Sequence, residues 1–339
     1  MSQNFKKILK KIAEGKNSEK KDMKNAFNMI MDGKISPIQI SAFLTALKYK
    51  GETVDDITAA VEVVRRKSLK IATPKGSIDT AGTGGDGLGT FNISTAAAFV
   101  AAACGVPVAK HGNKAQTSRS GSSDFLSALG AKLDLSPINL SRCIEQTNIC
   151  FMFAPNHHKS FKYVGPVRQE LGFRTIFNLV GPLSNPGNVK NQLLGVFSRM
   201  WVKPISEVLM RLKVKKAWVV HGSDGSDEIS VTGPTYIAEL SLNKIKTFLF
   251  NPKKYGIKIC KIKNVKGGTP EENAKIFKNI INGKIDSYRD MVIINSAAAL
   301  VVANKVKNIS QGIEMSTNAI DTGLVKQTLN NFVNFTNNC

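Results

Sequence analysis

The fold is decided by the stretch from Asp79 to Asp124, which reads DTAGTGGDGLGTFNISTAAAFVAAACGVPVAKHGNKAQTSRSGSSD. A short apolar strand leads into a glycine-rich turn, and the apolar run 93–104 that follows is predicted to be a helix. Glycines let several backbone N–H groups approach one anion, and a helix N-terminus adds unpaired donors and a positive dipole, so the stretch predicts an anion-binding loop. The glycines of the turn are Gly82, Gly84, Gly85, Gly87 and Gly89.

The side chains of this stretch favour the same interpretation. No carboxylate occurs between Asp86 and Asp124. The basic side chains there are Lys110, His111, Lys114 and Arg119. Asn92, Ser94 and Thr95 stand at the expected helix start, where short polar side chains either cap the helix or bind the ligand. We therefore expect a phosphate group at this turn.

Two better-known phosphate motifs fit less well. Gly82, Gly84 and Gly87 satisfy the G-x-G-x-x-G dinucleotide pattern, but that pattern expects an acidic residue about 20 positions further on. The corresponding stretch here, AACGVPVAK, contains no acid. A Walker A loop would need Gly-Lys-Ser/Thr after its second glycine, whereas Asp86 follows the glycines here.

Length and periodicity predict two domains. The 339 residues can bury one large core or two. From residue 77 onward, short apolar runs alternate with longer helical segments, which indicates parallel strands joined by crossover helices. The expected fold class is α/β, with a small all-helical N-terminal domain (1–70, plus a contribution from about 168–190) and a larger α/β domain (71–339) containing a mostly parallel central sheet. The expected later strands lie at 106–109, 149–153, 193–197, 217–220 and 291–294.

Two helix starts in the N-terminal domain are written as capping sequences. Ser36-Pro37-Ile38-Gln39 combines a cap, a proline at the first helical position and a glutamine at the third, and predicts a helix ending near Lys50-Gly51. The segment 53–56 has the same capping pattern, with an acid at the third helical position, and precedes the amphipathic run ITAAVEVVRR.

Composition excludes several classes of protein. No uncharged apolar run reaches the roughly 18 residues that a membrane crossing needs, and MSQNFKKILKKIAEGK lacks the apolar core of a secretory signal, so we expect a cytoplasmic protein. The five cysteines are widely spaced without a metal-binding pattern. The formal charge of +22 invites a nucleic-acid role, but the lysines are scattered with few interleaved aromatics, so no specific nucleic-acid partner is expected.

The segment VVHGSDGSDEIS places Asp224, Asp227 and Glu228 in a loop after a buried strand. An exposed acidic turn is one interpretation of these residues. Adjacent carboxylates repel unless a cation lies beside them, and hard oxygen ligands suit a Mg²⁺ ion that also binds phosphate. Because ligands of open α/β sheets bind beyond the carboxyl ends of the strands, a phosphate loop in the same sheet favours the magnesium interpretation.

A third polar segment, FAPNHHKSFKYVGPVRQELGFRTIFNLVGPLSNPGN, carries Arg168 and Arg174 among aromatic and apolar residues. Arginine offers a planar fork that matches a carboxylate. An ordinary salt bridge on a helix surface explains either arginine equally well at this point.

Together these segments resemble one family, the anthranilate phosphoribosyltransferases. GTGGDGLGTFNIST, KHGN, VRQELGFRTIFNLVGPLSNP and HGSDGSDEIS stand in that family's order, and the resemblance covers nearly the whole chain. It implies a homodimeric enzyme of the nucleoside phosphorylase class that transfers phosphoribose from 5-phosphoribosyl diphosphate (PRPP) to the amine of anthranilate in tryptophan biosynthesis. It also implies Mg²⁺, two ions per subunit, bound with PRPP. No dedicated catalytic acid or base is expected, because an aryl amine is already neutral at pH 7.

The resemblance also assigns residues to the substrates. Those expected to bind PRPP are Gly82, Gly85, Asp86, Thr90, Asn92, Ile93, Ser94, Thr95, Lys110, His111, Gly112, Asn113, Lys114, Ala115, Gln116, Thr117, Ser118 and Ser122. Those expected at anthranilate are Gly82, Asn113, Arg168, His158 and Pro182, with Arg168 facing the carboxylate. The expected metal ligands are Ser94, Asp227 and Glu228.

The chain departs from the family pattern at Lys114, Lys159 and Ser226, where arginine, proline and leucine are frequent. The change at Lys114 keeps the charge, and the other two put only local loop shape in doubt. A pyrimidine nucleoside phosphorylase is the nearest alternative enzyme, but its lysine- and glycine-rich signatures differ from KHGN and the Asp-Glu pair. A nucleic-acid-binding relative on the same fold is the alternative without catalysis, and it should lack the intact GTGGD and Asp-Glu motifs.

Overall fold

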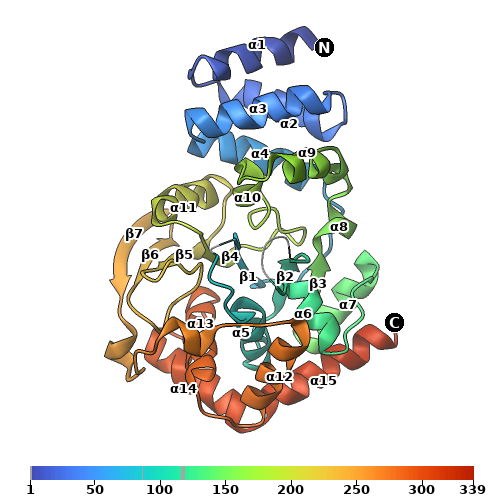
Figure 1. The fold of residues 1–339 in the computed structure, drawn as a ribbon. Coiled ribbons are helices and arrows are strands. Elements are labelled where there is room, and N and C mark those ends of the chain that lie inside the picture. The colour runs from blue at the N-terminus through green and yellow to red at the C-terminus, as the bar shows by residue number, and fades with distance from the viewer. Residues whose placement is uncertain (1, 86, 116–118) are drawn as a thin grey trace. The chain divides into compact units, whose positions relative to one another are not determined.

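The computed structural model describes residues 2–85, 87–115 and 119–339. The chain forms two compact units (Figure 1): unit 1 comprises Met1–Leu69 and Pro155–Pro186, and unit 2 comprises Lys70–Ala154 and Gly187–Cys339. The second stretch of unit 1 begins earlier than the segment 168–190 named above. The reason is local, because the chain turns into short helices directly after strand β3 (Ile149–Phe153).

The structured elements of unit 1 are all helical. Its first stretch contains α1 (Ser2–Ala13), α2 (Lys20–Met31), α3 (Pro37–Lys50) and α4 (Val54–Lys67). Its second stretch contains most of α8 (Ala154–His157), the 3-10 helix η1 (Lys159–Tyr163), α9 (Gly165–Leu171) and α10 (Ile176–Val180). The two stretches share one core, since the Phe27 ring meets Phe43 edge-on at 5.6 Å and Phe177 of α10 at 6.0 Å.

Both predicted capping sequences are confirmed. The Gln39 amide donates to Ser36 Oγ at 3.4 Å, and α3 ends at Gly51, whose φ of 87° suits glycine. At the start of α4, the Asp56 amide donates to Thr53 Oγ1 (3.2 Å), while the Thr53 amide donates to Asp56 Oδ2 (3.0 Å). This reciprocal pair satisfies two of the backbone donors that a helix start leaves open.

Asp56 also supports a buried ion pair, and this leads to a prediction. Lys50 Nζ lies 3.0 Å from Asp56 Oδ2, and the two side chains are only 3% and 2% exposed. Asp56→Ala should lower the free energy of unfolding by about 3–5 kcal/mol, because it leaves a buried ammonium without its carboxylate and removes the cap. Urea denaturation followed by circular dichroism measures this loss. The exposed neighbour on the same turn, Asp55→Ala, is the control and should cost less than about 1 kcal/mol; equal losses would contradict the prediction.

Unit 2 is built on a seven-stranded sheet with strand order β3-β2-β1-β4-β5-β6-β7. The strands are β1 (Ile78–Gly82), β2 (Val108–Gly112), β3 (Ile149–Phe153), β4 (Asn191–Gly195), β5 (Lys216–Gly222), β6 (Thr235–Ser241) and β7 (Lys244–Phe250). Pairings from β3 through β5 are parallel, whereas β6 and β7 pair antiparallel. The expected α/β class with a mostly parallel sheet is confirmed. The parallel strands direct their carboxyl ends to one edge, which places the loops after β1, β2, β4 and β5 together.

The helices of unit 2 lie both between the strands and after β7 in the sequence. They are α5 (Ile93–Ala103), α6 (Ser122–Ala128), α7 (Pro137–Thr147), η2 (Arg199–Trp201), α11 (Val202–Arg211), η3 (Pro252–Tyr255), η4 (Ile262–Val265), α12 (Pro270–Ile281), α13 (Ser287–Val302), α14 (Ile309–Asp321) and α15 (Leu324–Asn337). Helix α5, predicted from its apolar run, is packed by α13 and α15. The Phe99 ring of α5 lies 5.8 Å from Phe277 of α12 and 5.5 Å from Phe332 of α15. The C-terminal helices therefore enclose the helix that begins at the glycine-rich turn.

Two details of the predicted sheet are wrong. Residues 291–294 are not a strand but part of α13, whose residues are buried along most of its length. A short apolar run has no polar face, so its periodicity cannot separate a buried strand from a buried helix. The sequence interpretation also missed the hairpin of β6 and β7, which turns at Leu242 and Asn243 with φ of 50° and 57°. No glycine marks that turn, and this is why the pattern was not visible.

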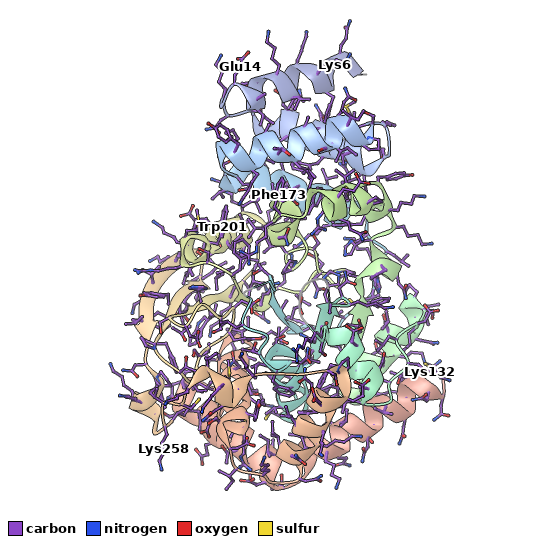
Figure 2. The ribbon with its side chains drawn as sticks, viewed as in Figure 1. Lys6, Glu14, Lys132, Phe173, Trp201 and Lys258 are labelled. Atoms are coloured by element: carbon purple, nitrogen blue, oxygen red, sulfur yellow. The ribbon has the colours of Figure 1, made fainter. Side chains whose placement is uncertain are left out.

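The surface is rich in lysine, as the composition requires. Lys6 of α1 and the loop residues Lys132 and Lys258 are exposed and extend outward (Figure 2). Within the described ranges, no helix combines the length and the apolar character that a membrane crossing needs.

Candidate functional site

The loop after β1 has the backbone of an anion site. Gly84, Gly85, Gly87 and Gly89 all have positive φ, between 61° and 77°. A side chain at any of these positions would be strained, so the loop keeps its amides accessible only with glycine. The loop ends at Asn92, where α5 begins.

Asn92 does not cap α5. No cap hydrogen bond comes from its side chain. Instead its Oδ1 accepts from Ser120 Oγ (3.0 Å) and from Asn273 Nδ2 (2.8 Å), and its Nδ2 donates to the Ser120 carbonyl (3.2 Å). Asn92 therefore ties the loop after β1 to the loop after β2 and to α12.

The second basic segment begins at the end of β2. Lys110 is 2% exposed, and its ammonium donates to the Thr80 carbonyl and to Ser94 Oγ (3.3 Å). Burial lowers the pKa of Lys110 from its ordinary value, while the carboxylates of Asp79, Glu228 and Asp227 oppose that shift. The Lys110 ammonium thus lies between β1 and the first turn of α5.

After Lys110, the chain folds back onto the start of α6. The amides of Ala115 and Gly121 both donate to Asp124 Oδ2 at 2.9 Å, and Ser122 Oγ donates to the Asn113 carbonyl at 3.3 Å. Asp124, the acid that closes the deciding stretch, is thereby engaged by backbone amides. Of the residues expected at PRPP, Asp86 and Gln116 to Ser118 lie outside the described ranges. The described ones all lie in unit 2, in the last residues of β1 and β2 and in the segments that follow these strands.

The adjacent carboxylates after β5 point back to the first loop. Asp227 Oδ2 accepts from the Gly84 amide at 2.7 Å. Glu228 Oε1 accepts from the Ser94 amide at 3.1 Å, so this distant side chain supplies the N-cap contact that Asn92 does not make. Glu228 therefore contacts Ser94, and Asp227 contacts the glycine loop that leads to Ser94. Asp227 and Glu228 do not form a solvated acidic turn.

Asp224 has a different role from its two neighbours. Its carboxylate accepts hydrogen bonds from Ser226 (Oγ, 2.7 Å), Ser230 (Oγ, 2.6 Å) and Thr232 (Oγ1, 2.6 Å). Burial alone would raise the pKa of Asp224, but these hydrogen bonds outweigh burial and hold the pKa below its ordinary value. Ser226 is thus part of a network that shapes the loop.

The loop after β5 can approach the sheet only because two glycines face it. A Cβ on Gly82 would overlap the Asp227 carboxylate, and a Cβ on Gly195 would overlap the Asp227 carbonyl. The sequence interpretation included Gly82 but not Gly195, nor Asn273, whose contact to Asn92 crosses 181 positions of sequence. Only the three-dimensional packing reveals these contacts.

The remaining predicted residues belong to unit 1. The Arg168 guanidinium donates to Asn178 Oδ1 at 3.5 Å and lies 5.9 Å from the centre of the Phe177 ring. Burial lowers its pKa from the ordinary value, and among the described residues no carboxylate forms a salt bridge with it. Arg174 is exposed. An internal salt bridge therefore does not explain Arg168.

The two adjacent histidines have separate surroundings. His157 Nδ1 lies 2.7 Å from the Leu69 carbonyl, and burial lowers its pKa against the opposing effect of that contact. His158 is 5% exposed, and its ring lies 5.8 Å from the Phe161 ring. Pro182 follows α10 and is partly exposed. His157 is thus structural, whereas His158 and Pro182 stay candidates for substrate contact.

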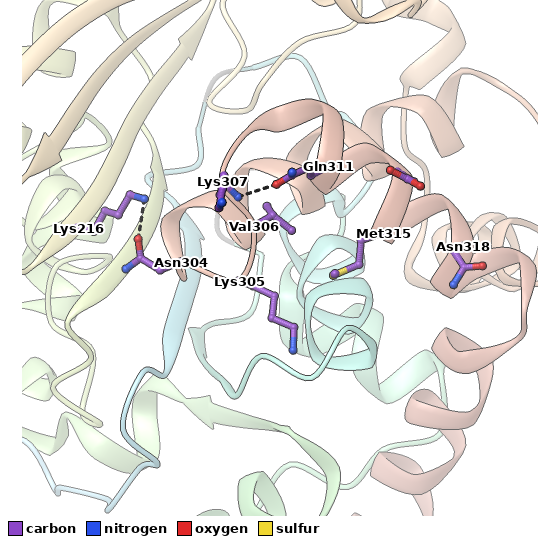
Figure 3. Close-up of a pocket in the computed structure, with 9 residues that line it drawn as sticks. Lys216, Asn304, Lys305, Val306, Lys307, Gln311, Met315 and Asn318 are labelled. Atoms are coloured by element: carbon purple, nitrogen blue, oxygen red, sulfur yellow. Dashed lines mark hydrogen bonds between the residues drawn. The ribbon is translucent and has the colours of Figure 1, made fainter.

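No metal cluster made only of protein side chains accompanies these residues. The described part of the chain contains no group of three or more His, Cys, Asp or Glu side chains placed to hold an ion. A cavity of about 880 Å³ lies elsewhere, lined by Lys216, residues 304–307 and residues of α14 (Figure 3). Lys216 Nζ donates there to Asn304 Oδ1 at 2.8 Å, and Lys216 begins β5, so this cavity is at the amino edge of the sheet, away from the glycine loop.

Comparison with known proteins gives consistent results. Residues 75–326 match the model described as "Glycosyl transferase family, a/b domain", and residues 6–68 match "Glycosyl transferase family, helical bundle domain". The chain is 47% identical to an anthranilate phosphoribosyltransferase of Bradyrhizobium sp. strain BTAi1, over 98% of this chain and 99% of the relative.

Solved structures show the same similarity. The anthranilate phosphoribosyltransferase of Thermus thermophilus superposes with a TM-score of 0.92 at 36% identity, covering 97% of this chain and 99% of that one. The enzyme of Saccharomyces cerevisiae in complex with PRPP and Mg has a TM-score of 0.92 at 27% identity, covering 100% and 99%.

Proposed function

Because the chain belongs to the anthranilate phosphoribosyltransferase family, we propose that the geometry described above carries out that family's reaction. The 5-phosphoribosyl group of PRPP is transferred to the amine of anthranilate, which yields N-(5-phosphoribosyl)anthranilate and diphosphate in tryptophan biosynthesis. The observation that carries the proposal is the contact of Asp227 and Glu228 with the glycine loop and the start of α5. Two carboxylates beside an anion-binding loop would repel a bound phosphate. A cation between the carboxylates and the phosphate removes that repulsion, which explains why the pair stands there.

In this proposal the loops after β1 and β2 bind PRPP. The diphosphate is assigned to the amides of the glycine loop and of the first turn of α5 other than those of Gly84 and Ser94, which donate to Asp227 and Glu228. The remaining phosphate is assigned to the segment from Lys110 to Ser122. The Lys110 ammonium is fixed by hydrogen bonds to the Thr80 carbonyl and the Ser94 hydroxyl. It is therefore proposed to act on the bound phosphates from a fixed position near the start of α5. Asp86 and Gln116 to Ser118 are included on the resemblance alone.

The donors present suit magnesium. Mg²⁺ is typically held by one or two carboxylates together with substrate phosphates, and the chain offers the Ser94 hydroxyl, Asp227 and Glu228 at the phosphate loop. When bound, Mg²⁺ neutralises charge on the departing diphosphate. The absence of a larger protein cluster among the described residues fits an ion that depends on substrate oxygens. We propose two ions per subunit.

The chemistry requires positioning and charge neutralisation. The C1–O bond to diphosphate breaks through a transition state with oxocarbenium character, while the aryl amine attacks C1. Because the amine is neutral at pH 7, the protein needs to orient it and not to deprotonate it beforehand. The proton that the nitrogen loses once the C–N bond has formed passes to the carboxylate of anthranilate itself. The basic residues around the glycine loop neutralise charge on the departing diphosphate. We assign no dedicated acid or base.

On the resemblance, the residues assigned to anthranilate are Gly82, Asn113, His158, Arg168 and Pro182. The support for Arg168 is its partly buried guanidinium, which is oriented by Asn178 and Phe177 without a carboxylate among the described residues. A guanidinium in that state can donate two parallel hydrogen bonds to a ligand carboxylate. On this basis, unit 1 is proposed as the acceptor-binding domain and unit 2 as the PRPP-binding domain.

Arg168→Ala should raise the Michaelis constant for anthranilate by about 10- to 100-fold, because a hydrogen-bonded charge pair contributes roughly 1.5–3 kcal/mol. The Michaelis constant for PRPP should change less than about twofold. Arg168→Lys should restore only part of the loss, since an ammonium lacks the fork. Arg174→Ala is the matched control, because its side chain is exposed on the following turn. Normal anthranilate saturation in Arg168→Ala would remove this residue from the acceptor site.

The function is tested by the loss of anthranilate fluorescence in the presence of PRPP and Mg²⁺. We expect strict dependence on both. The pyrimidine nucleoside phosphorylase alternative is tested in parallel with a pyrimidine nucleoside and inorganic phosphate, from which no free base should be released. Phosphorolysis without anthranilate consumption would refute the proposal.

A homodimer and a cytoplasmic location also stay proposals. Ile38 and Tyr49 of α3 are 83% and 90% exposed, and we propose them as candidates for contact with a second subunit. Light scattering on the purified protein measures the mass directly, and a monomer at micromolar concentration would contradict the dimer.

A further inference from the structure

A buried polar residue stands in the middle of an apolar helix. Asn295 of α13 is 0% exposed and lies within the run MVIINSAAALVV. Asparagine is a weak helix former, and its amide must find partners when it is buried. When a residue breaks local rules in a core, a functional requirement is the usual reason.

The partner of Asn295 is the loop that carries the carboxylates. Asn295 Oδ1 accepts from the Ile229 amide at 3.0 Å, and its Nδ2 donates to the Ile229 carbonyl at 2.9 Å. The second Nδ2 hydrogen is directed to the Met291 carbonyl, at 2.8 Å. One side chain therefore fixes both backbone polar groups of Ile229, much as a neighbouring strand would.

Ile229 directly follows Glu228, so fixing its backbone limits where the preceding carboxylates can point. Glu228 Oε1 lies 3.1 Å from the Ser94 amide, and Asp227 Oδ2 lies 2.7 Å from the Gly84 amide. These two contacts attach the loop to the phosphate site, but several backbone conformations of the loop would satisfy them. The hydrogen bonds from Asn295 to Ile229 restrict the loop to one of these arrangements.

We propose that Asn295 is a positioning residue, which holds the Asp227–Glu228 carboxylates in the geometry that binds magnesium together with PRPP. This inference rests on the proposed function. Asn295 itself touches neither substrate nor metal. Its contribution is preorganisation, because a loop already held in place loses less entropy when the metal and PRPP bind.

The test variant is Asn295→Leu, which keeps the approximate shape but removes every hydrogen bond to Ile229. The magnesium concentration for half-maximal activity at fixed PRPP should rise at least about tenfold, a size typical of lost support behind a metal ligand. The Michaelis constant for anthranilate, measured at saturating magnesium, should stay within about twofold.

Ser296→Ala is the matched control. Ser296 is the next residue of α13, is equally buried, and donates only to the Val292 carbonyl of its own helix at 2.7 Å. Its loss should reduce stability without changing the magnesium requirement. A general weakening of α13 would affect both variants alike, and that result would overturn the proposal.

Two further readouts do not depend on turnover. Hydrogen exchange should show the Ile229 amide protected in the wild type and in Ser296→Ala but exposed to exchange in Asn295→Leu. The rise in melting temperature caused by PRPP with Mg²⁺ should be present in the first two proteins and largely lost in the third. If Asn295→Leu does not fold, Asn295→Ala replaces it in the same measurements.

These measurements distinguish a failure of the proposed function from a failure of the positioning role of Asn295. A wild-type protein that does not consume anthranilate refutes the proposed function. An active wild type with an unchanged magnesium requirement and an unchanged ligand-induced melting shift in the Asn295 variants overturns the positioning role alone.

Discussion

Replacing Asp227 and Glu228 together with alanine should reduce phosphoribosyl transfer by roughly 10³-fold or more, the range seen when preorganised charge stabilisation is removed from an active site. The two carboxylates reach the glycine loop and the start of α5, where the diphosphate is proposed to bind. Without them, magnesium delivered with PRPP keeps only the neutral Ser94 hydroxyl as a protein ligand. Titration of Mg²⁺ at fixed PRPP, followed by anthranilate fluorescence, should show strict dependence in the wild type and little activity of the variant at any concentration.

The pair Asp227→Asn with Glu228→Gln separates charge from structure. Amide oxygens can still accept from the Gly84 and Ser94 amides, so this variant should keep the loop in place and melt close to the wild type. It should nevertheless be nearly inactive, because neutral amides bind magnesium weakly. A double amide variant with normal turnover would show that these residues only shape the loop and that the metal is bound elsewhere.

Gly195→Ala should produce the second large effect, although Gly195 carries no chemistry. A Cβ at this position would overlap the Asp227 carbonyl, and its neighbours there are backbone atoms that cannot rotate away. Either β4 or the carboxylate loop must move, which should cost about 1–3 kcal/mol of stability, the usual range for overpacking. A displacement of about 1 Å in positioned groups costs on the order of 100-fold in rate, so activity should fall far more than stability.

Gly165→Ala is the control for this prediction. Gly165 opens α9, and a Cβ added there would stand in open space. The Pro166 ring restricts a side chain at this position, so alanine should cost at most about 1 kcal/mol of stability and leave activity unchanged. Activity and thermal melting are measured on both variants. Wild-type kinetics in Gly195→Ala would mean that the loop tolerates displacement and that its close approach to β4 is not required.

The features readable from the sequence alone are those set by neighbouring residues. The glycine loop, the start of α5 and the caps at Ser36 and Thr53 depend on backbone conformation and contacts within a few positions. A short window therefore contains all the information that specifies them. The parallel sheet followed from apolar runs alternating with helical segments.

Other features were settled only by tertiary packing. The run 291–294 is uniformly apolar, and its neighbours in space, not its own pattern, make it helix instead of strand. The hairpin of β6 and β7 turns on Leu242 and Asn243 without glycine, so no local signal announced it.

The candidate site divides in the same way. The types of residue that bind phosphate and magnesium were visible in the loops after β1, β2 and β5, because each loop has a composition suited to its chemistry. The support around them was not visible. Glu228 caps α5 from a distance of 134 positions in sequence, and Asn295 holds Ile229 across 66. Such contacts leave no periodic trace in the chain, since a hydrogen bond depends on where folding brings two groups and not on how far apart they stand in sequence.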